Sequence, residues 1–283
     1  MQTLLDNPAF QAAGAPFVST LLLALVLRRF WPAGMGLAIT AGFLLAAALI
    51  AGLNLQPLTS TRKIILSSVV LPLLVLVMGF FPRMRGADLW RWLPTVLLTA
   101  AAMWILWPVL QRQEGGAVIL AATPVLLYTV VLSAGFVALA SRQAPVDQAF
   151  NSVAAALLTL GLASGAVSLI AASALYSQLA FAVAASCGAM IVVGMLGSKG
   201  HWDACALHAA SMPVILLAGA ATVYAQLPEL VLLCLALVPL FVVLPLPRPS
   251  RPWPQLIVMC LWSAVPVLPA LWLAWRAAGP VSF

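Results

Sequence analysis

The stretch GSKGHWDACALHAASM, residues 197–212, is where the sequence gathers histidine, aspartate, cysteine and methionine together. His201, Cys205, His208 and Met212 follow one another at steps of four, three and four residues, so a helix would place them on one face. Imidazole, thiolate and thioether form a soft ligand set that suits copper, and an imidazole alone can bind a haem or a chlorin. The pattern therefore raises the hypothesis of a metal or cofactor site.

Helix geometry limits this site. A rise of about 1.5 Å per residue separates His201 from Met212 by roughly 16 Å, so one ion cannot use all four side chains. A metal would have to use neighbours within the set Cys205, His208 and Met212, completed by ligands from other helices, whereas a pigment or other cofactor would need His208 alone.

A simpler interpretation of the same stretch is the start of a membrane helix. Asp203 suits the N-cap position, and His201 and Trp202 suit the wet interface. His208 would then lie inside the membrane, with a hydroxyl or carbonyl of a neighbouring helix as its partner. We favour a structural histidine over a contact to a polar substrate or proton, and both over a metal or pigment ligand, and we expect no required cofactor.

Other catalytic chemistry is scarce. None of the six acidic residues falls in the middle of an apolar run, although a proton- or sodium-coupled carrier normally needs a carboxylate at membrane depth. The sequence contains no HExxH, no GxSxG and no phosphate-binding loop. We therefore expect that the protein is not an enzyme.

The elements that carry these residues follow from composition. Of 283 residues, 64% are hydrophobic and 7% are charged, whereas a soluble domain carries about 25% charged residues. Continuous apolar runs of about 17–24 residues match the length that a helix needs to cross roughly 30 Å of hydrocarbon. The sequence predicts an all-α, polytopic transmembrane helical bundle.

Turn residues and charges divide the chain into about ten spans. We place them at 10–28, 34–53, 64–81, 93–110, 117–140, 149–172, 175–196, 204–225, 230–246 and 255–275. The break near Ser173–Ser177 has the weakest signal, and without it every later span would reverse direction. No connection exceeds about a dozen residues, which predicts one integral membrane domain over residues 1–283 with no extramembrane domain.

Lysine and arginine predict the orientation. Nine of the 13 fall after odd-numbered spans, namely Arg28, Arg29, Arg83, Arg85, Arg91, Arg142, Lys199, Arg248 and Arg251, and the other four are Arg62, Lys63, Arg112 and Arg276. The positive-inside rule then places the nine in the cytoplasm and both termini outside, as in a bacterial-type inner membrane. Five tryptophans flank these basic loops as predicted interfacial anchors: Trp31, Trp90, Trp92, Trp202 and Trp253. Cations scattered in this way do not form a nucleic-acid-binding face.

Small residues predict close helix packing. Span six contains Gly161 and Gly165 in a GxxxG pattern, with Ser164 and Ser168 on the same periodicity. Such residues let helix backbones approach closely in lipid. We favour packing within this chain over an interface with another subunit.

Prolines suggest a repeat. Pro72 and Pro213 fall at similar depths in spans three and eight. Pro124 interrupts span five, and Pro266 and Pro269 interrupt span ten. Five spans per half with opposite starting sides would fit an inverted repeat. Ten short-looped spans are similar in outline to the drug/metabolite transporter superfamily, which implies an inverted-repeat carrier. The resemblance covers span number and length, while that family's aromatic-glycine entry and glycine-glutamate pair are missing here and its orientation is opposite.

Two functions remain open from the sequence. The first is a non-catalytic subunit that acts as a scaffold in a larger membrane complex, with lipids and other membrane subunits as partners. Scarce buried polar groups and short loops favour it. The second is a small carrier for a neutral or amphipathic solute, which the proline-broken spans favour.

Overall fold

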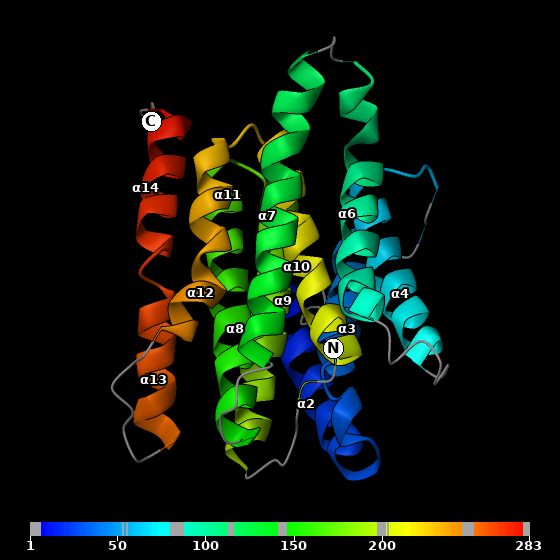
Figure 1. Ribbon diagram of the computed structural model, residues 1–283, viewed down its shortest axis with the longest axis vertical. Coiled ribbons are helices and arrows are strands. Elements are labelled where there is room, and N and C mark those ends of the chain that lie inside the picture. Colours follow the sequence, from blue (N-terminus) through cyan, green and yellow to red (C-terminus); the bar gives the residue numbers. More distant parts are fainter. Residues whose placement is uncertain are drawn as a thin grey trace.

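The structure is a computed structural model in which helices are joined by short connections (Figure 1). It describes residues 7–52, 54, 56–79, 88–112, 116–140, 146–196, 202, 204–244 and 252–279. Within these ranges the regular structure is entirely helical, which confirms the predicted all-α class.

The first half of the chain begins with a π-helix, η1, that runs directly into α2, and a short 3-10 turn, η2, leads to α3. The bounds are η1 Phe10–Gly14, α2 Ala15–Phe30, η2 Pro32–Gly34, α3 Leu37–Ala51, α4 Ser60–Gly79, α6 Asp88–Leu110 and α7 Gly116–Ala140. The second half contains α8 Val146–Ile170, α9 Ala174–Met195, α10 Ala204–Tyr224, α11 Glu229–Ala236, α12 Val238–Val243, α13 Pro252–Ser263 and α14 Val267–Ala278.

Each of the ten predicted ranges coincides with a helix or a pair of helices. Among the described residues, seven helical stretches are long and apolar enough to cross a membrane: Phe10–Phe30, Trp92–Leu110, Val118–Leu139, Phe150–Ile170, Ala174–Met195, Ala206–Tyr224 and Trp253–Ala278. The other predicted spans correspond to α3, α4 and α11–α12, and the 15 residues of α3 reach only about 22 Å. Composition and these seven helices together indicate a membrane protein.

Prolines break some helices and not others. Pro239, for which no break was predicted, lies next to the break between α11 and α12. Pro266 lies in the turn between α13 and α14, so span ten is interrupted as predicted, and Pro269 lies in the first turn of α14. At that turn the Val265 amide donates to the Trp262 carbonyl at 3.2 Å, in place of the bond that Pro266 cannot make. The predicted interruption at Pro124 is wrong, because α7 continues through this residue as a helix.

The weakest predicted break is present. Helix α8 ends at Ile170 and α9 begins at Ala174, and Ala172 between them adopts a positive φ of 57°. The Ser173 amide donates to the Ser168 carbonyl at 2.9 Å, which closes the end of α8. The chain therefore reverses here, and α8 and α9 pack along their lengths.

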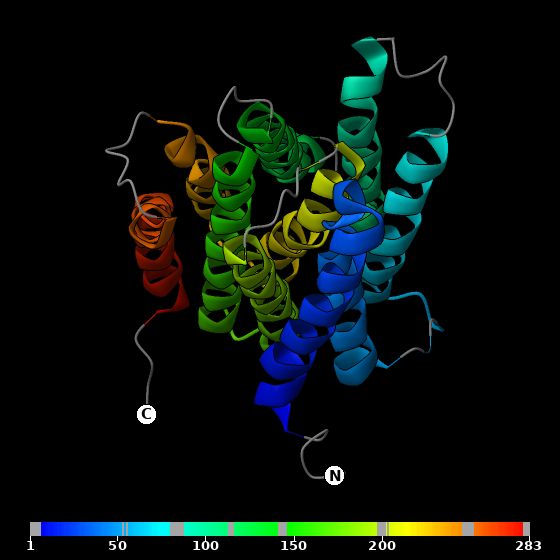
Figure 2. The same cartoon turned by 90° about the horizontal axis from the view of Figure 1, so that it is seen from below.

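Helix α10 forms the centre of the bundle. It contacts α3, α4, α6, α7, α8, α9 and α11, and 94% of its most apolar stretch is buried. Figure 2 shows α10, in yellow, between the blue and cyan helices of the first half and the green helices α7–α9. Helix α2 packs outside α3 and α9, and α13 and α14 pack outside α8, α11 and α12.

The contacts do not show the predicted inverted repeat. In a five-plus-five repeat α4 would be the counterpart of α10. Yet α4 lies at the edge of the bundle, against α3, α6 and α10, and exposes Val70, Leu73, Leu74 and Val77. The repeat therefore stays a prediction.

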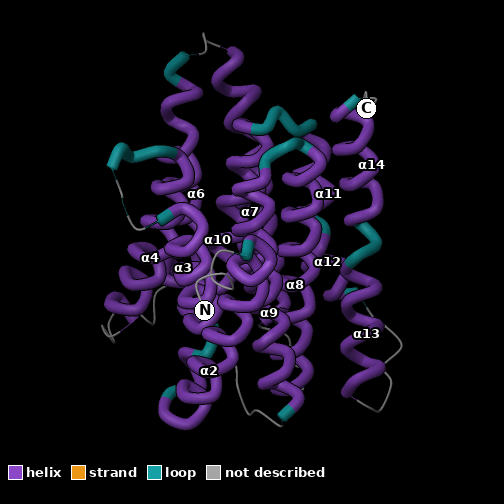
Figure 3. The backbone as a smooth tube through the Cα atoms, turned by 180° about the vertical axis from the view of Figure 1, so that it is seen from behind, coloured by secondary structure: helices purple, strands orange, loops and turns teal. Residues whose placement is uncertain are grey.

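The surface matches the predicted environment. Large apolar side chains are exposed along the outer faces, for example Leu22 and Val26 on α2 and Leu261 and Leu268 on α13 and α14. The charged side chains that the structure describes lie within about one turn of a helix end: Arg28, Arg29, Arg62, Lys63, Arg112, Glu229 and Arg276. Figure 3 shows most helices running lengthwise between the two ends of the bundle, with α13 and α14 in line along one side.

Candidate functional site

His208 lies in the second turn of α10, and its side chain is 2% exposed. Its ring nitrogen Nε2 is 3.3 Å from Ser133 Oγ on α7. Ser133 Oγ is in turn 2.6 Å from Thr95 Oγ1 on α6. These three residues form a buried chain of hydrogen bonds across three helices, which we call the His208 network.

The network satisfies a polar residue that would be costly in an apolar core. The central position of α10 brings His208 against α6 and α7 at once, and two small hydroxyl side chains fill the gap. A hydroxyl has one hydrogen and two lone pairs, so Ser133 can bond both neighbours. The predicted partner of His208, a hydroxyl on a neighbouring helix, is therefore present at hydrogen-bond distance.

The network ends at a groove on the outside of the bundle. This α6 groove is lined by Trp92, Thr95, Val96, Thr99, Ala100 and Met103 of α6 and by Val130 of α7, and its volume is about 500 Å³. The α6 residues recur at three- and four-residue steps, so they form one stripe along the helix. Thr95 belongs both to the groove wall and to the His208 network.

The predicted metal set is only partly placed. His208 and Met212 are both buried on α10, whereas the side chain of Cys205 and all of His201 lie outside the described residues. The His208 ring is directed at hydroxyl groups, and the described residues contain no cluster of three histidine, cysteine or acidic side chains. A metal or pigment at His208 stays a prediction.

The predicted packing residues of α8 face two directions. A Cβ on Gly161 would lie 2.9 Å from the Ala184 amide nitrogen, and one on Gly165 would lie 2.6 Å from the Phe181 ring, so both glycines lie against α9. Ser164 and Ser168 instead line a small void shared with α10 and α11. All four residues therefore lie at contacts within this chain.

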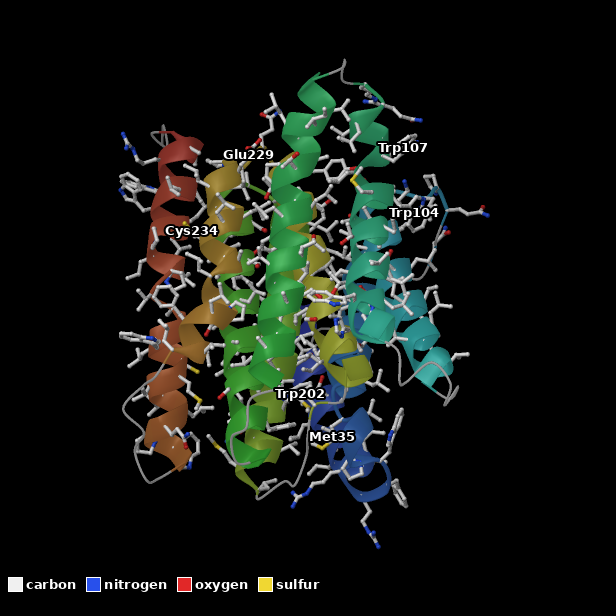
Figure 4. All side chains as sticks on the ribbon, in the orientation of Figure 1. Met35, Trp104, Trp107, Trp202, Glu229 and Cys234 are labelled. Atoms are coloured by element: carbon white, nitrogen blue, oxygen red, sulfur yellow. The ribbon has the colours of Figure 1, made fainter. Side chains whose placement is uncertain are left out.

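The predicted tryptophan anchors differ from one another. Trp31, Trp92 and Trp253 are exposed, and the side chain of Trp90 lies outside the described residues. Trp202 is half-buried and stacks on Phe150, with ring centroids 5.2 Å apart, and its Nε1 donates to the Phe150 carbonyl. Figure 4 shows Trp202 and Met35 toward one end and Trp104 and Trp107 toward the other. Trp104 and Trp107, which the sequence did not single out as anchors, are exposed as an interfacial tryptophan would be.

Lys63 is the functional candidate that the sequence did not single out. The sequence placed it in a loop, but it lies in the first turn of α4 and is 8% exposed. Its Nζ donates to the Trp104 carbonyl at 3.1 Å and lies 5.2 Å from the centroid of the Trp104 ring. That carbonyl would normally accept from residue 108, which is proline and has no N–H. Lys63 therefore supplies the missing donor.

The same relationship occurs at α10. Pro213 cannot donate to the Ala209 carbonyl, and Thr40 Oγ1 of α3 donates to it at 2.8 Å. Near the Lys63 contact, the Tyr224 hydroxyl of α10 donates to the Ile105 carbonyl of α6 at 2.8 Å. The sequence shows which carbonyls lose their helical donor, because a proline follows each of them by four residues. It does not show that Lys63 and Thr40 supply the replacement donors, because these residues lie on other helices.

Comparisons with known proteins assign no family. No protein-family model matches the sequence, and no curated protein matches it either. The functional inference therefore depends on the geometry above.

Proposed function

We propose that this chain is a non-catalytic integral membrane subunit that acts as a scaffold or accessory component of a larger membrane protein complex. The observation that carries the proposal is the filled centre of the bundle. A carrier needs a cavity at membrane depth with polar groups that replace the solute's hydration. Here α10 occupies that position and is buried against seven other helices.

Two voids beside α10 support this proposal. One lies against α8 and α11 and has no room for a water molecule, and the other lies against α6 and α7 and measures about 10 Å³. The second is lined by apolar residues such as Ile105, Val125 and Ile215, so it offers no partners for a polar solute. Several buried polar side chains, among them Thr40, Lys63 and Ser133, instead connect helices.

The topology that goes with this function has ten spans. In it α3, α4 and α11–α12 cross the bilayer together with the seven longer stretches. An even number of spans and the nine-to-four division of lysine and arginine support placing both termini outside a bacterial-type inner membrane. The exposed apolar faces of α2 and α13–α14 would then be available to lipids and partner subunits.

A carrier for a neutral or amphipathic solute is the second candidate. It is favoured by the buried Lys63 and by the proline-freed carbonyls at Trp104 and Ala209, because transporters use interrupted helices at their binding sites. In this structure donors from neighbouring helices already occupy both carbonyls. Extraction in mild detergent followed by native electrophoresis and a flux assay distinguishes the two functions.

A further inference from the structure

The small void between α8, α10 and α11 is lined by three hydroxyl side chains, and we call it the Ser164 void. Ser164 and Ser168 of α8, Thr222 of α10 and Leu235 of α11 belong to its lining, and its other side chains are alanine, valine and leucine. Ser164 is 2% exposed, and its Oγ forms no hydrogen bond with the residues that the structure describes. A buried hydroxyl of this kind requires an explanation, such as an ordered water or an ion.

The oxygens around the void offer lone pairs. Thr222 Oγ1 donates its hydrogen to the Ala218 carbonyl at 3.0 Å, which leaves two lone pairs for another partner. The Leu235 carbonyl lies four residues before Pro239, which has no N–H, so this carbonyl lacks its helical donor. The Leu237 amide contacts it across the break but is shared with another carbonyl of α11. Oxygens that accept more than they donate suit a positively charged ligand.

The helix ends beside the void also favour a cation. Ser168 lies in the last turn of α8, and Thr222 lies in the last turn of α10. The C-terminal end of a helix carries a partial negative charge, which a lysine or arginine in the last turn can offset. Neither α8 nor α10 has a basic residue there. The negative ends of two helices therefore lie beside the void, and their last turns supply no cation.

Size and charge narrow the choice of cation. The void has no room for a water molecule, so an ion must bind there without its hydration shell and must be smaller than water. A dehydrated sodium ion meets this requirement, whereas a potassium ion is about as large as a water molecule. Calcium and magnesium are bound in proteins through carboxylates, and no acidic residue lines the void. Main-chain carbonyls at interrupted membrane helices, by contrast, are known ligands of sodium.

We propose that the Ser164 void binds one dehydrated sodium ion, with Ser164 Oγ, Thr222 Oγ1 and the Leu235 carbonyl as ligands. Ser168, one turn from Ser164, adds a fourth oxygen. The ion offsets the negative ends of α8 and α10 and joins both helices to α11 at the break beside Pro239. This inference is independent of the scaffold function, because a sodium ion that stabilises the fold requires no transport and the scaffold would stand without it.

Binding of radioactive sodium to the purified full-length protein tests the site. The protein is prepared in detergent with choline chloride, and a scintillation proximity assay measures the bound tracer against unlabelled sodium or potassium chloride. We expect saturable binding of one ion per chain, with potassium competing about tenfold less well than sodium. The unfolding temperature should rise with sodium concentration but not with choline at equal ionic strength, because a ligand of the folded state stabilises it.

Three variants test the ligands. Ser164→Ala removes one ligand and should weaken sodium binding about tenfold, the factor that 1.4 kcal/mol represents. Ser186→Ala is the matched control and should keep the wild-type affinity, because Ser186 is also buried without a hydrogen-bond partner but lies on α9, outside the lining of the void. Pro239→Ala returns a main-chain donor to the Leu235 carbonyl and should weaken binding with every hydroxyl in place.

The measurements on the wild-type protein decide the proposal even if a variant does not fold. Absence of saturable sodium binding would overturn it, and so would potassium that competes as well as sodium. Wild-type affinity in both Ser164→Ala and Pro239→Ala, or an equal loss in Ser164→Ala and Ser186→Ala, would show that the ion binds elsewhere and would also overturn it.

Discussion

Lys63 of α4 donates to the carbonyl of Trp104 on α6, the carbonyl that Pro108 leaves without its helical donor. The ammonium also lies over the Trp104 ring. A buried cation thus offsets the loss of a main-chain hydrogen bond on another helix, and this joins α4 to α6 at the proline. The relationship explains why a lysine is tolerated among apolar side chains.

A double-mutant cycle should reveal this relationship. Lys63→Met leaves the Trp104 carbonyl unpaired in the wild-type background, whereas in Pro108→Ala the alanine N–H can bond it. We expect Lys63→Met to cost about 1 kcal/mol more with Pro108 than with alanine at that position. SDS titration of the purified protein measures the unfolding free energies. Lys63→Met removes the cost of burying the ammonium in both backgrounds, so that cost cancels in the coupling energy. Equal effects of Lys63→Met in both backgrounds would show that Lys63 does not replace the donor that Pro108 lacks.

Thr40 should show the same dependence on Pro213. Thr40→Val removes the donor to the Ala209 carbonyl and should destabilise the protein by about 0.6–1.7 kcal/mol. In Pro213→Ala the loss should be close to zero, because the N–H of the introduced alanine can donate along the helix. Thr123→Val is a matched control, since Thr123 donates to Ile119 within its own helix and that carbonyl keeps its main-chain donor. A loss at Thr123 as large as that at Thr40 would contradict the explanation.

The glycines of α8 and α9 should respond oppositely to alanine. Gly161→Ala places a methyl group 2.9 Å from the Ala184 amide, and since backbone atoms cannot move aside cheaply, we expect a loss of about 1–3 kcal/mol. At Gly188 the nearest atoms are those of the Phe17 ring at 3.9 Å, so Gly188→Ala should be tolerated and gain about 0.5–1 kcal/mol from helix propensity. Thermal unfolding of both variants in detergent checks the pair; a stable Gly161→Ala would show that α8 and α9 are less closely packed.

His208 should act as a structural residue. The His208→Ala and Ser133→Ala variants should show a coupling of about 0.5–1.5 kcal/mol, the contribution of one hydrogen bond. Neither variant should change the metal content or the visible absorption spectrum of the purified protein. Loss of a metal or of an absorption band in His208→Ala would instead support the ligand hypothesis.

The sequence was most informative where one helix decides the outcome by itself. The length of the apolar runs predicted the helices. The turn at Ala172 lies at the predicted break between α8 and α9, because the length of the apolar run already required a break there. Pro124 and Pro266 show the limit. Each removes one helical hydrogen bond, but α7 remains continuous while α13 and α14 separate, and packing between helices decides which occurs.

The candidate site depended on contacts between distant segments. His208 was identified from its type and position, but Ser133 lies 75 residues away and Thr95 lies on a third helix. Lys63 was predicted to lie in a loop, because the residues next to it in the sequence do not indicate that Trp104 and Pro108 of α6 lie beside it. The α6 stripe from Trp92 to Met103 could be read from its spacing, whereas its hollow shape depends on Val130 of α7.

Native electrophoresis of the chain, extracted from its own membrane in mild detergent, tests the scaffold function most directly. The proposed function predicts co-migration with a fixed set of partner proteins, identified by mass spectrometry and retained after a second separation step. Vesicles that contain the purified chain alone should then show no swelling in glycerol or sorbitol beyond that of empty vesicles. Migration as a single species of 29.7 kDa plus bound detergent would contradict the scaffold function, and solute-driven swelling of those vesicles would establish the carrier in its place.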